Sequence, residues 1–147
     1  MRDAGSLASW ELGVGSWELG VDILKPVDVP NAPRPVGPYS SAMIVGNLVY
    51  VSGQSGRDPV TDSVSEDIEA QTEQVLTNIR TILEAAGSSL SKVVRCGVFL
   101  VDMGDFKRMN AVYERMFAGH KPARTTVAVS ELPGPGLRVE IDAIATL

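Results

Sequence analysis

The sequence predicts an α+β domain in which two helices lie on one face of a mixed β-sheet. Short β-forming runs alternate with two longer segments whose apolar residues recur at helical spacing, in the order β-β-α-β-α-β-β. The chain of 147 residues is long enough for one domain with a substantial core. Two helices cannot cover both faces of such a sheet, so we expect the uncovered face to meet another subunit.

The first 25 residues differ from the rest of the chain. The sequence Ser-Trp-Glu-Leu-Gly-Val occurs at residues 9–14 and again at residues 16–21. Two copies are too few for a solenoid, and the glycines of this segment disfavour a helix. We therefore expect a flexible N-terminal extension over residues 1–25, with a partner-docking segment as the alternative, and a single domain over residues 26–147.

A proline-rich lead-in precedes the first two expected strands. Residues 25–38 contain five prolines and are typical of extended chain. Residues 43–45 and 48–52 are β-forming and flank Gly46-Asn47, which favours a two-residue hairpin turn. Residues 53–65 are expected to form a loop.

Two amphipathic helices follow, separated by a strand. The first is expected to start near Ser65, to repeat apolar residues with a 3.6-residue period and to stop at Gly87. Residues 93–101 form a mostly apolar strand. Asp102–Asp105 supplies capping side chains for the second helix, whose apolar stripe runs from Phe106 to Phe117.

Two strands at the C-terminus carry the most informative charges. Residues 124–129 and 137–145 are β-forming, and Arg124 and Glu140 interrupt these runs. An arginine binds a carboxylate through two parallel hydrogen bonds, and a glutamate can orient or deprotonate water. Taken alone, however, the pattern favours solvated surface charges, with Arg138 paired to Glu140.

The composition excludes several classes of site. A net charge of −5 disfavours binding to nucleic acids or anionic membranes. With one cysteine and one histidine, Cys96 and His120, the chain has no disulfide of its own and no evident metal-ligand spacing, so we expect no metal and no cofactor. Cys96 is expected to be a buried core thiol and His120 a plain loop residue. No apolar run approaches the ~20 residues of a membrane span, and the N-terminus lacks the features of a targeting peptide, so the cytoplasm is the expected compartment.

A series of short motifs occurs in one order along the domain. The motifs are Gly37-Pro38-Tyr39-Ser40, Val51-Ser52-Gly53-Gln54, Asp58-Pro59, Glu84-Ala85-Ala86-Gly87-Ser88, Asp105-Phe106 with Asn110 and Tyr113, Pro122-Ala123-Arg124, Leu132-Pro133 and Val139-Glu140-Ile141. Together they strongly resemble the YjgF/RidA reactive-intermediate deaminase family over residues 32–147.

This resemblance implies a fold, an assembly and a reaction. The implied fold is a chorismate-mutase-like α+β domain that forms homotrimers with active clefts between subunits. The implied reaction is the cofactor-free hydrolysis of enamine and imine acids, such as 2-aminoacrylate and 2-iminopropanoate, to a 2-keto acid and ammonia. Carried over by position, Arg124 would clamp the substrate carboxylate and Glu140 would hold the attacking water. The residues that would line the cleft are Tyr39, Ser52, Gly53, Asn110 and Thr126.

Some positions depart from the common pattern of the family. Ser41 stands where glutamine is usual, Ser55-Gly56-Arg57 replaces a more apolar stretch, and Asp142 stands where a second glutamate is frequent. These changes bear on substrate preference rather than on the fold.

Two other functions stay open. One is a non-catalytic trimer that binds small carboxylates. The other is the RNA cleavage or translation inhibition attributed to relatives, which the acidic charge disfavours.

Overall fold

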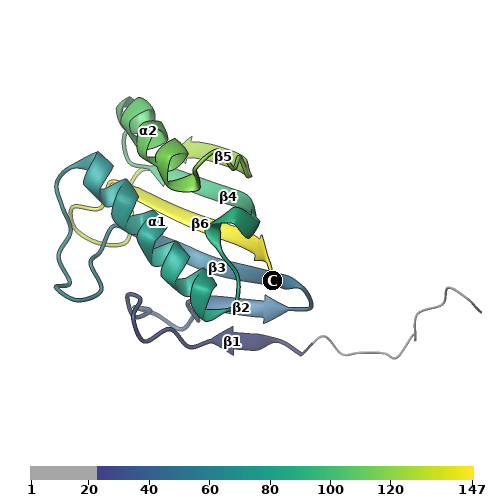
Figure 1. Cartoon of the computed structure of the whole chain (residues 1–147). Helices are drawn as coiled ribbons and strands as arrows, with labels where there is room; N and C mark the ends of the chain where they lie inside the picture. The colour runs from purple at the N-terminus through teal and green to yellow at the C-terminus, as the bar shows by residue number, and fades with distance from the viewer. Residues whose placement is uncertain (1–22) are drawn as a thin grey trace, which may run out of the picture.

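A computed structural model of the protein describes residues 23–147; the expected extension and its repeated segment lie outside these residues, apart from residues 23–25. The strands are β1 (Lys25–Val27), β2 (Ala42–Val45), β3 (Leu48–Ser55), β4 (Val93–Leu100), β5 (Ala123–Ala128) and β6 (Val139–Thr146). They form one sheet in the order β1-β2-β3-β6-β4-β5. The β4–β5 pair is parallel and the other pairs are antiparallel. The C-terminal strand β6 therefore lies inside the sheet, between β3 and β4 (Figure 1).

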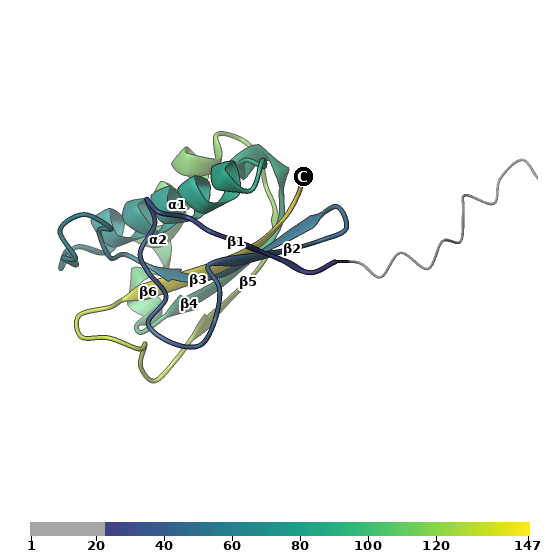
Figure 2. The ribbon, with the colours of Figure 1, turned by 90° about the horizontal axis from the view of Figure 1, so that it is seen from below.

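Two α-helices pack on the same face of this sheet. They are α1 (Ile68–Ala85) and α2 (Phe106–Phe117), and two short 3₁₀ turns, η1 (Leu90–Lys92) and η2 (Met103–Asp105), precede β4 and α2. Both helices lie in front of the sheet in Figure 1, and Figure 2 shows α1 running along one side of it. Within residues 23–147 no helix is long and apolar enough to cross a membrane.

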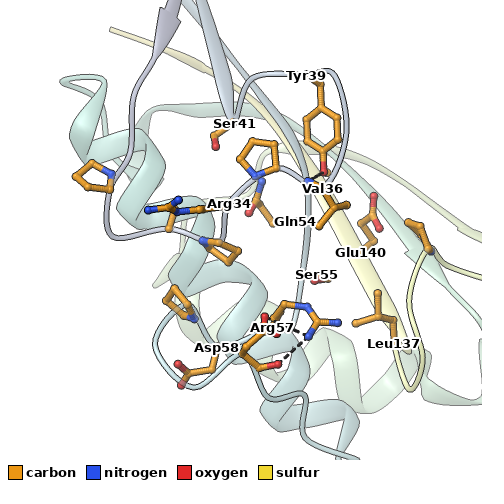
Figure 3. Close-up of a pocket in the computed structure, with 18 residues that line it drawn as sticks. Arg34, Val36, Tyr39, Ser41, Gln54, Ser55, Arg57, Asp58, Leu137 and Glu140 are labelled. Carbon is orange, nitrogen blue, oxygen red and sulfur yellow. Dashed lines mark hydrogen bonds and ion pairs between the residues drawn. The ribbon is translucent and has the colours of Figure 1, made fainter.

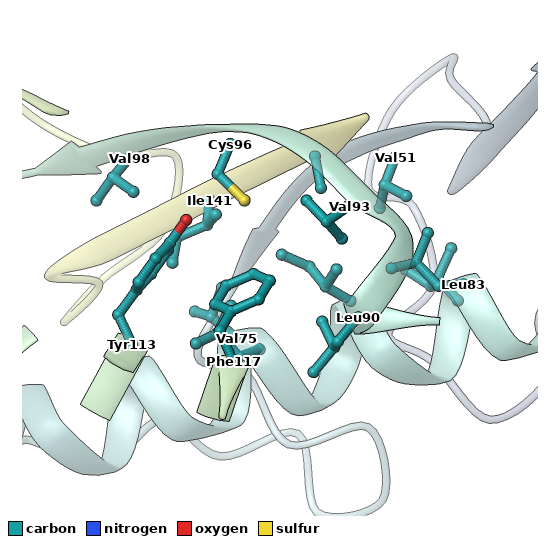
Figure 4. Close-up of a cluster of buried hydrophobic side chains, with 14 of the residues drawn as sticks. Val51, Val75, Leu83, Leu90, Val93, Cys96, Val98, Tyr113, Phe117 and Ile141 are labelled. Carbon is teal, nitrogen blue, oxygen red and sulfur yellow. The ribbon is translucent and has the colours of Figure 1, made fainter. Parts of the chain in front are cut away.

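The core lies between the helices and the sheet face that they cover. In β6, Val139, Ile141 and Ala143 are buried on this face, whereas Glu140 and Asp142 alternate with them and point to the other side. The core also takes apolar side chains from both helices and from η1, β3 and β4. The core residues labelled in Figure 4 are Val51, Val75, Leu83, Leu90, Val93, Cys96, Val98, Tyr113, Phe117 and Ile141. Each large aliphatic side chain buried there contributes about 1.5–3 kcal/mol to stability.

The structure confirms the expected fold class and adds one strand. Residues 25–27, expected only as an extended lead-in, pair with β2 and form the edge strand β1. Their sequence, Lys-Pro-Val, did not signal a strand because proline is confined to edge strands and strand starts. Helix α1 begins at Ile68 rather than near Ser65, because the Asp67 side chain accepts a backbone N–H from the first turn and caps the helix there.

Gln71 of α1 holds the loop that leads into β6. This side chain is fully buried, and its Nε2 donates hydrogen bonds to the carbonyl oxygens of Ser65 (2.6 Å) and Gly136 (2.8 Å). Its Oε1 accepts a hydrogen bond from the backbone N–H of Arg138 at 2.9 Å. One side chain therefore pairs with three backbone groups, two of them more than 60 positions away in sequence, and fixes the start of the strand that carries Glu140.

Arg138 pairs with Asp105 and not with Glu140. Its Nη2 lies 2.7 Å from Oδ1 of Asp105, which is 7% exposed, and its Nη1 donates to the carbonyl oxygen of Glu66 at 2.9 Å. The alternative in which Arg138 neutralises Glu140 is therefore wrong. Among the residues that the structure describes, Glu140 has no ion-pair partner.

We expect Gln71→Leu to lower the free energy of unfolding by about 2–4 kcal/mol, because two carbonyl oxygens and one N–H lose their partner in a buried place. Urea unfolding followed by circular dichroism measures this. The matched control is Gln74→Leu on the same helix. Within residues 23–147 the half-buried side chain of Gln74 bonds only to Asn78, so this change should cost about 1 kcal/mol or less. Equal losses in the two variants would contradict the role of Gln71.

Candidate functional site

The two predicted catalytic side chains lie on opposite faces of the sheet. Arg124 of β5 pairs with Cys96 of β4, which is fully buried under the helices, so Arg124 points to the helix-covered side. Glu140 of β6 pairs with Phe99 of β4. Because Phe99 lies three positions after Cys96 along the strand, it faces the other side of the sheet, and so does Glu140.

The guanidinium group of Arg124 rests against two aromatic rings of α2. Its Cζ lies 4.7 Å from the ring centroid of Tyr113 and 5.8 Å from that of Phe106. Within residues 23–147 no carboxylate forms an ion pair with Arg124. A cation–π contact of this kind contributes about 0.5–2 kcal/mol and leaves the N–H donors of the guanidinium available for a ligand.

Polar side chains beside Arg124 lack hydrogen-bond partners among the described residues. Three buried atoms have no hydrogen bond to any described residue: Oδ1 of Asn110, the hydroxyl of Tyr113 and Oγ1 of Thr126. Asn110 and Tyr113 line a cavity of about 420 Å³ together with Arg124, and Thr126 lies two positions beyond Arg124 on the same face of β5. Burial raises the pKa of Tyr113, so its hydroxyl keeps its proton. Buried polar atoms are rarely left unpaired. The hydroxyls of Tyr113 and Thr126 can donate to an anion beside Arg124, and Oδ1 of Asn110 can accept from a donor on the same ligand.

Glu140 lines a second, larger cavity of about 710 Å³ (Figure 3). Tyr39 and Gly53 line the same cavity. A methyl group on Gly53 would overlap Oε1 of Glu140, so the carboxylate depends on a glycine at that position. Burial, and next the negative charge of Asp142, raise the pKa of Glu140 above its usual range. A carboxylate with a raised pKa is a better proton acceptor than an exposed one.

Ser52 and Tyr39 belong to the Glu140 side of the sheet. The Ser52 hydroxyl donates to the carbonyl oxygen of Ser40 at 2.7 Å and lies in a hollow that Tyr39 also borders. The Tyr39 side chain is 48% exposed, and its hydroxyl accepts a hydrogen bond from the backbone N–H of Val36 at 3.3 Å. Both hydroxyls thus brace the loop before β2.

The predicted site residues therefore fall into two groups that one subunit does not bring together. Tyr39, Ser52, Gly53 and Glu140 form one group, and Asn110, Arg124 and Thr126 form the other. Among residues 23–147, no three His, Cys, Asp or Glu side chains converge in a way that could hold a metal ion.

Three side chains that contact Arg124 or line its cavity are not predicted as site residues by the sequence. Tyr113 and Phe106 were assigned to the apolar stripe of the helix; the i, i+3 spacing of Asn110 and Tyr113 places both on one helical face and was the available signal. His120, expected as a plain loop residue, has Nε2 2.6 Å from the carbonyl oxygen of Val93 and lines the Arg124 cavity. Cys96 is buried, as expected.

Comparisons with known proteins agree on one family. Residues 29–147 match the family model described as Endoribonuclease L-PSP. A RutC family protein of Pyrococcus horikoshii is 53% identical over 116 residues, which cover 78% of this chain and 91% of the relative. The 2-iminobutanoate/2-iminopropanoate deaminase of Salmonella typhimurium is 42% identical over 124 residues, covering 82% and 96%. The crystal structure of Escherichia coli TdcF with bound serine superposes with a TM-score of 0.80 at 34% identity, covering 84% of this chain and 98% of that one.

We expect Gly53→Ala and Gly56→Ala to differ in their effect on stability. The added methyl at Gly53 meets the flexible end of the Glu140 side chain, which can rotate away, so the loss should be about 1 kcal/mol or less. At Gly56 the methyl lies 2.9 Å from Cα of Gln71, and the backbone must move, at a cost of about 1–3 kcal/mol. Urea unfolding compares the two variants. A larger loss for Gly53→Ala would contradict this arrangement.

Proposed function

The chain belongs to the endoribonuclease L-PSP family, also called YjgF/RidA, as its motifs indicated, and we propose that it is a cofactor-free deaminase of reactive imino acids. In this proposal it hydrolyses 2-imino acids and their enamine tautomers to 2-keto acids and ammonia. The Salmonella typhimurium relative is named a 2-iminobutanoate/2-iminopropanoate deaminase, and one of Arabidopsis thaliana is named Reactive Intermediate Deaminase A; both names support the reaction class. The observation that carries the proposal for this chain is the guanidinium of Arg124, which aromatic rings hold without a carboxylate partner among residues 23–147.

The proposed active unit contains two subunits. Arg124 and Glu140 lie on opposite faces of one sheet, so a small acid cannot touch both within one chain. We therefore propose a homotrimer in which the Arg124 group of one subunit meets the Glu140 cavity of the next. Apolar side chains on the sheet face without helices support such a contact; Tyr50 is 45% exposed and Val127 is 40% exposed.

The proposed mechanism uses the intrinsic reactivity of the imine. Arg124 binds the substrate carboxylate through two N–H donors and thereby fixes the position of C2. Glu140 holds a water molecule and accepts one of its protons as the oxygen bonds to C2 of the protonated imine. Glu140 returns this proton to the nitrogen of the resulting carbinolamine. The C–N bond then breaks and ammonia leaves, while the hydroxyl passes its proton to Glu140 and becomes the C=O of the 2-keto acid. One water is consumed, and no electrons are exchanged with another molecule.

Two other functions make different predictions. A non-catalytic binder of small carboxylates would be stabilised by 2-keto acids but would not release ammonia from imines. An RNA-cleaving protein would act on RNA without metal and lose this activity on substitution at the same site. The net charge of −5 opposes attraction of an RNA backbone, so the deaminase is the function that the residues support best.

We expect Arg124→Ala to lower kcat/KM for imine hydrolysis by about 100-fold or more, which corresponds to about 2.7 kcal/mol, because the substrate loses its bidentate partner. Arg124→Lys should lower kcat/KM less than Arg124→Ala does, since a lysine keeps the positive charge but cannot form the two parallel hydrogen bonds to the carboxylate. Ammonia release from 2-aminoacrylate generated in situ measures the rate. Arg115→Ala, which removes an exposed arginine of α2 paired with Glu73, is the control. Equal rates for Arg124→Ala and the wild-type protein would refute the assigned role.

We expect two inactive variants to restore activity when they assemble together. In trimers formed by co-expressing Arg124→Ala with Glu140→Gln, about one cleft in four would receive an intact Arg124 and an intact Glu140 from different subunits. Activity should therefore recover to about a quarter of the wild-type value per subunit. Trimers of either variant alone are the controls, and light scattering checks the assembly. If both residues acted within one subunit, co-assembly would restore nothing.

A further inference from the structure

We propose that Arg57 forms a second anion-binding position in the Glu140 cavity and selects 2-imino acids that carry a second carboxylate. The substrate class is a dicarboxylic 2-imino acid with four or five carbons. This inference rests on the proposed deaminase function and deepens it. It starts from Arg57, which follows β3 and lines the same cavity as Glu140.

The strand geometry places Arg57 in line with Glu140. Ser55 of β3 pairs directly with Glu140 of β6, and a further bridge pairs Arg57 with Val64 just beyond the end of β3. Ser55 and Arg57 flank Gly56, where the chain bends, and both line the cavity together with Glu140. Figure 3 shows Ser55 between Glu140 and Arg57 along one wall of the cavity. This order along the wall suits a short dicarboxylic acid whose imine carbon lies at Glu140 and whose second carboxylate reaches Arg57.

The backbone of Arg57 is fixed and its guanidinium is only partly used. Nδ2 of Asn78 donates to the carbonyl oxygen of Arg57 at 2.9 Å. Nη1 of Arg57 donates to the carbonyl oxygen of Asp62 at 2.7 Å and lies 3.3 Å from its carboxylate. Within residues 23–147, Nε and Nη2 make no hydrogen bond. The arginine side chain is 27% exposed and Asp62 is 85% exposed, so the counter-ion is solvated while free donors remain at the cavity.

The other charged side chains that line the cavity, apart from Asp62, form no ion pair with Arg57 among the described residues. Asp58 turns its carboxylate to the backbone N–H groups of Val60 and Thr61, and these bonds lower its pKa. Arg34 also lines the cavity and has no ion pair among the described residues. Among residues 23–147, the acidic residues that line the cavity are Asp58, Asp62 and Glu140, and Glu140 lies at the end where the imine carbon would sit. The far end of the cavity is therefore the place for a second negative group.

The size of the cavity agrees with a larger substrate. A volume of about 710 Å³ is in the range of pockets that hold ligands of drug size, whereas a three-carbon acid would fill a small part of it. A hydrogen bond to a charged group contributes about 1.5–3 kcal/mol, which corresponds to a preference of roughly 10- to 100-fold for an acid that reaches Arg57.

Ligand binding tests this inference without relying on turnover. Calorimetry compares 2-oxoglutarate, a dicarboxylic keto acid, with 2-oxobutanoate, which lacks the second carboxylate, on the full-length protein. We expect the wild-type protein to bind 2-oxoglutarate about 10-fold more tightly or better, and Arg57→Met to bring the ratio of the two dissociation constants close to one. Arg57→Lys should keep part of the preference. Asp62→Asn, which removes the competing carboxylate, should increase it.

The outcomes separate the inference from the proposed function. A wild-type ratio near one, or an equal ratio in the wild-type protein and Arg57→Met, would overturn the role of Arg57. Hydrolysis of 2-iminosuccinate and 2-iminobutanoate, each generated in situ by an amino-acid oxidase, then tests the same preference in kcat/KM. If neither imine is hydrolysed, the deaminase proposal fails, and the binding ratio still decides whether Arg57 selects a second carboxylate.

Discussion

The alternation of side chains along β6 is the constraint on which the rest of the structure depends. Because β6 lies between β3 and β4, its residues Val139 and Ile141 complete the core while Glu140, between them, faces away from the helices. A shift of one position would bury the carboxylate and expose the core residues. The hydrogen bonds of Gln71 fix this register where the strand begins, so the same contacts that stabilise the domain also place the proposed base.

Three arginines of this chain differ in whether their charge is paired inside the subunit or is free to bind a ligand. Arg138 has a buried carboxylate partner, Asp105, and further bonds to the backbone, so its charge is neutralised inside the subunit. Arg124 has aromatic neighbours instead, which hold its position, and no carboxylate of residues 23–147 compensates its charge. Arg57 lies between these cases, with one side bound to Asp62. An arginine that retains free donors in a cavity can bind a ligand, because no internal partner has to be displaced.

Local patterns in the sequence predicted the helices and strands, but not the long-range contacts and the strand register that bring them together. The apolar period predicted α1, and strand alternation placed Arg124 and Thr126 on one face, because both signals lie within a few neighbouring residues. The pairing of Arg138 with Asp105, 33 positions away, has no such local signal. The separation of Arg124 from Glu140 by the sheet depends on the register of three strands. The family resemblance named both residues, and the structure shows why a single subunit does not unite them.

Because the proposed site is divided between two subunits, the pKa of Glu140 would depend both on trimer formation and on substrate binding. In one subunit, burial and Asp142 raise the pKa of Glu140. In the proposed trimer, a guanidinium from the neighbouring subunit would favour the charged carboxylate and lower this pKa, so deprotonation of Glu140 and assembly would support each other. A substrate carboxylate that pairs with Arg124 would then weaken this attraction and raise the pKa again. Glu140 would thus be the stronger base when the imine is bound, which is when a proton has to leave the water.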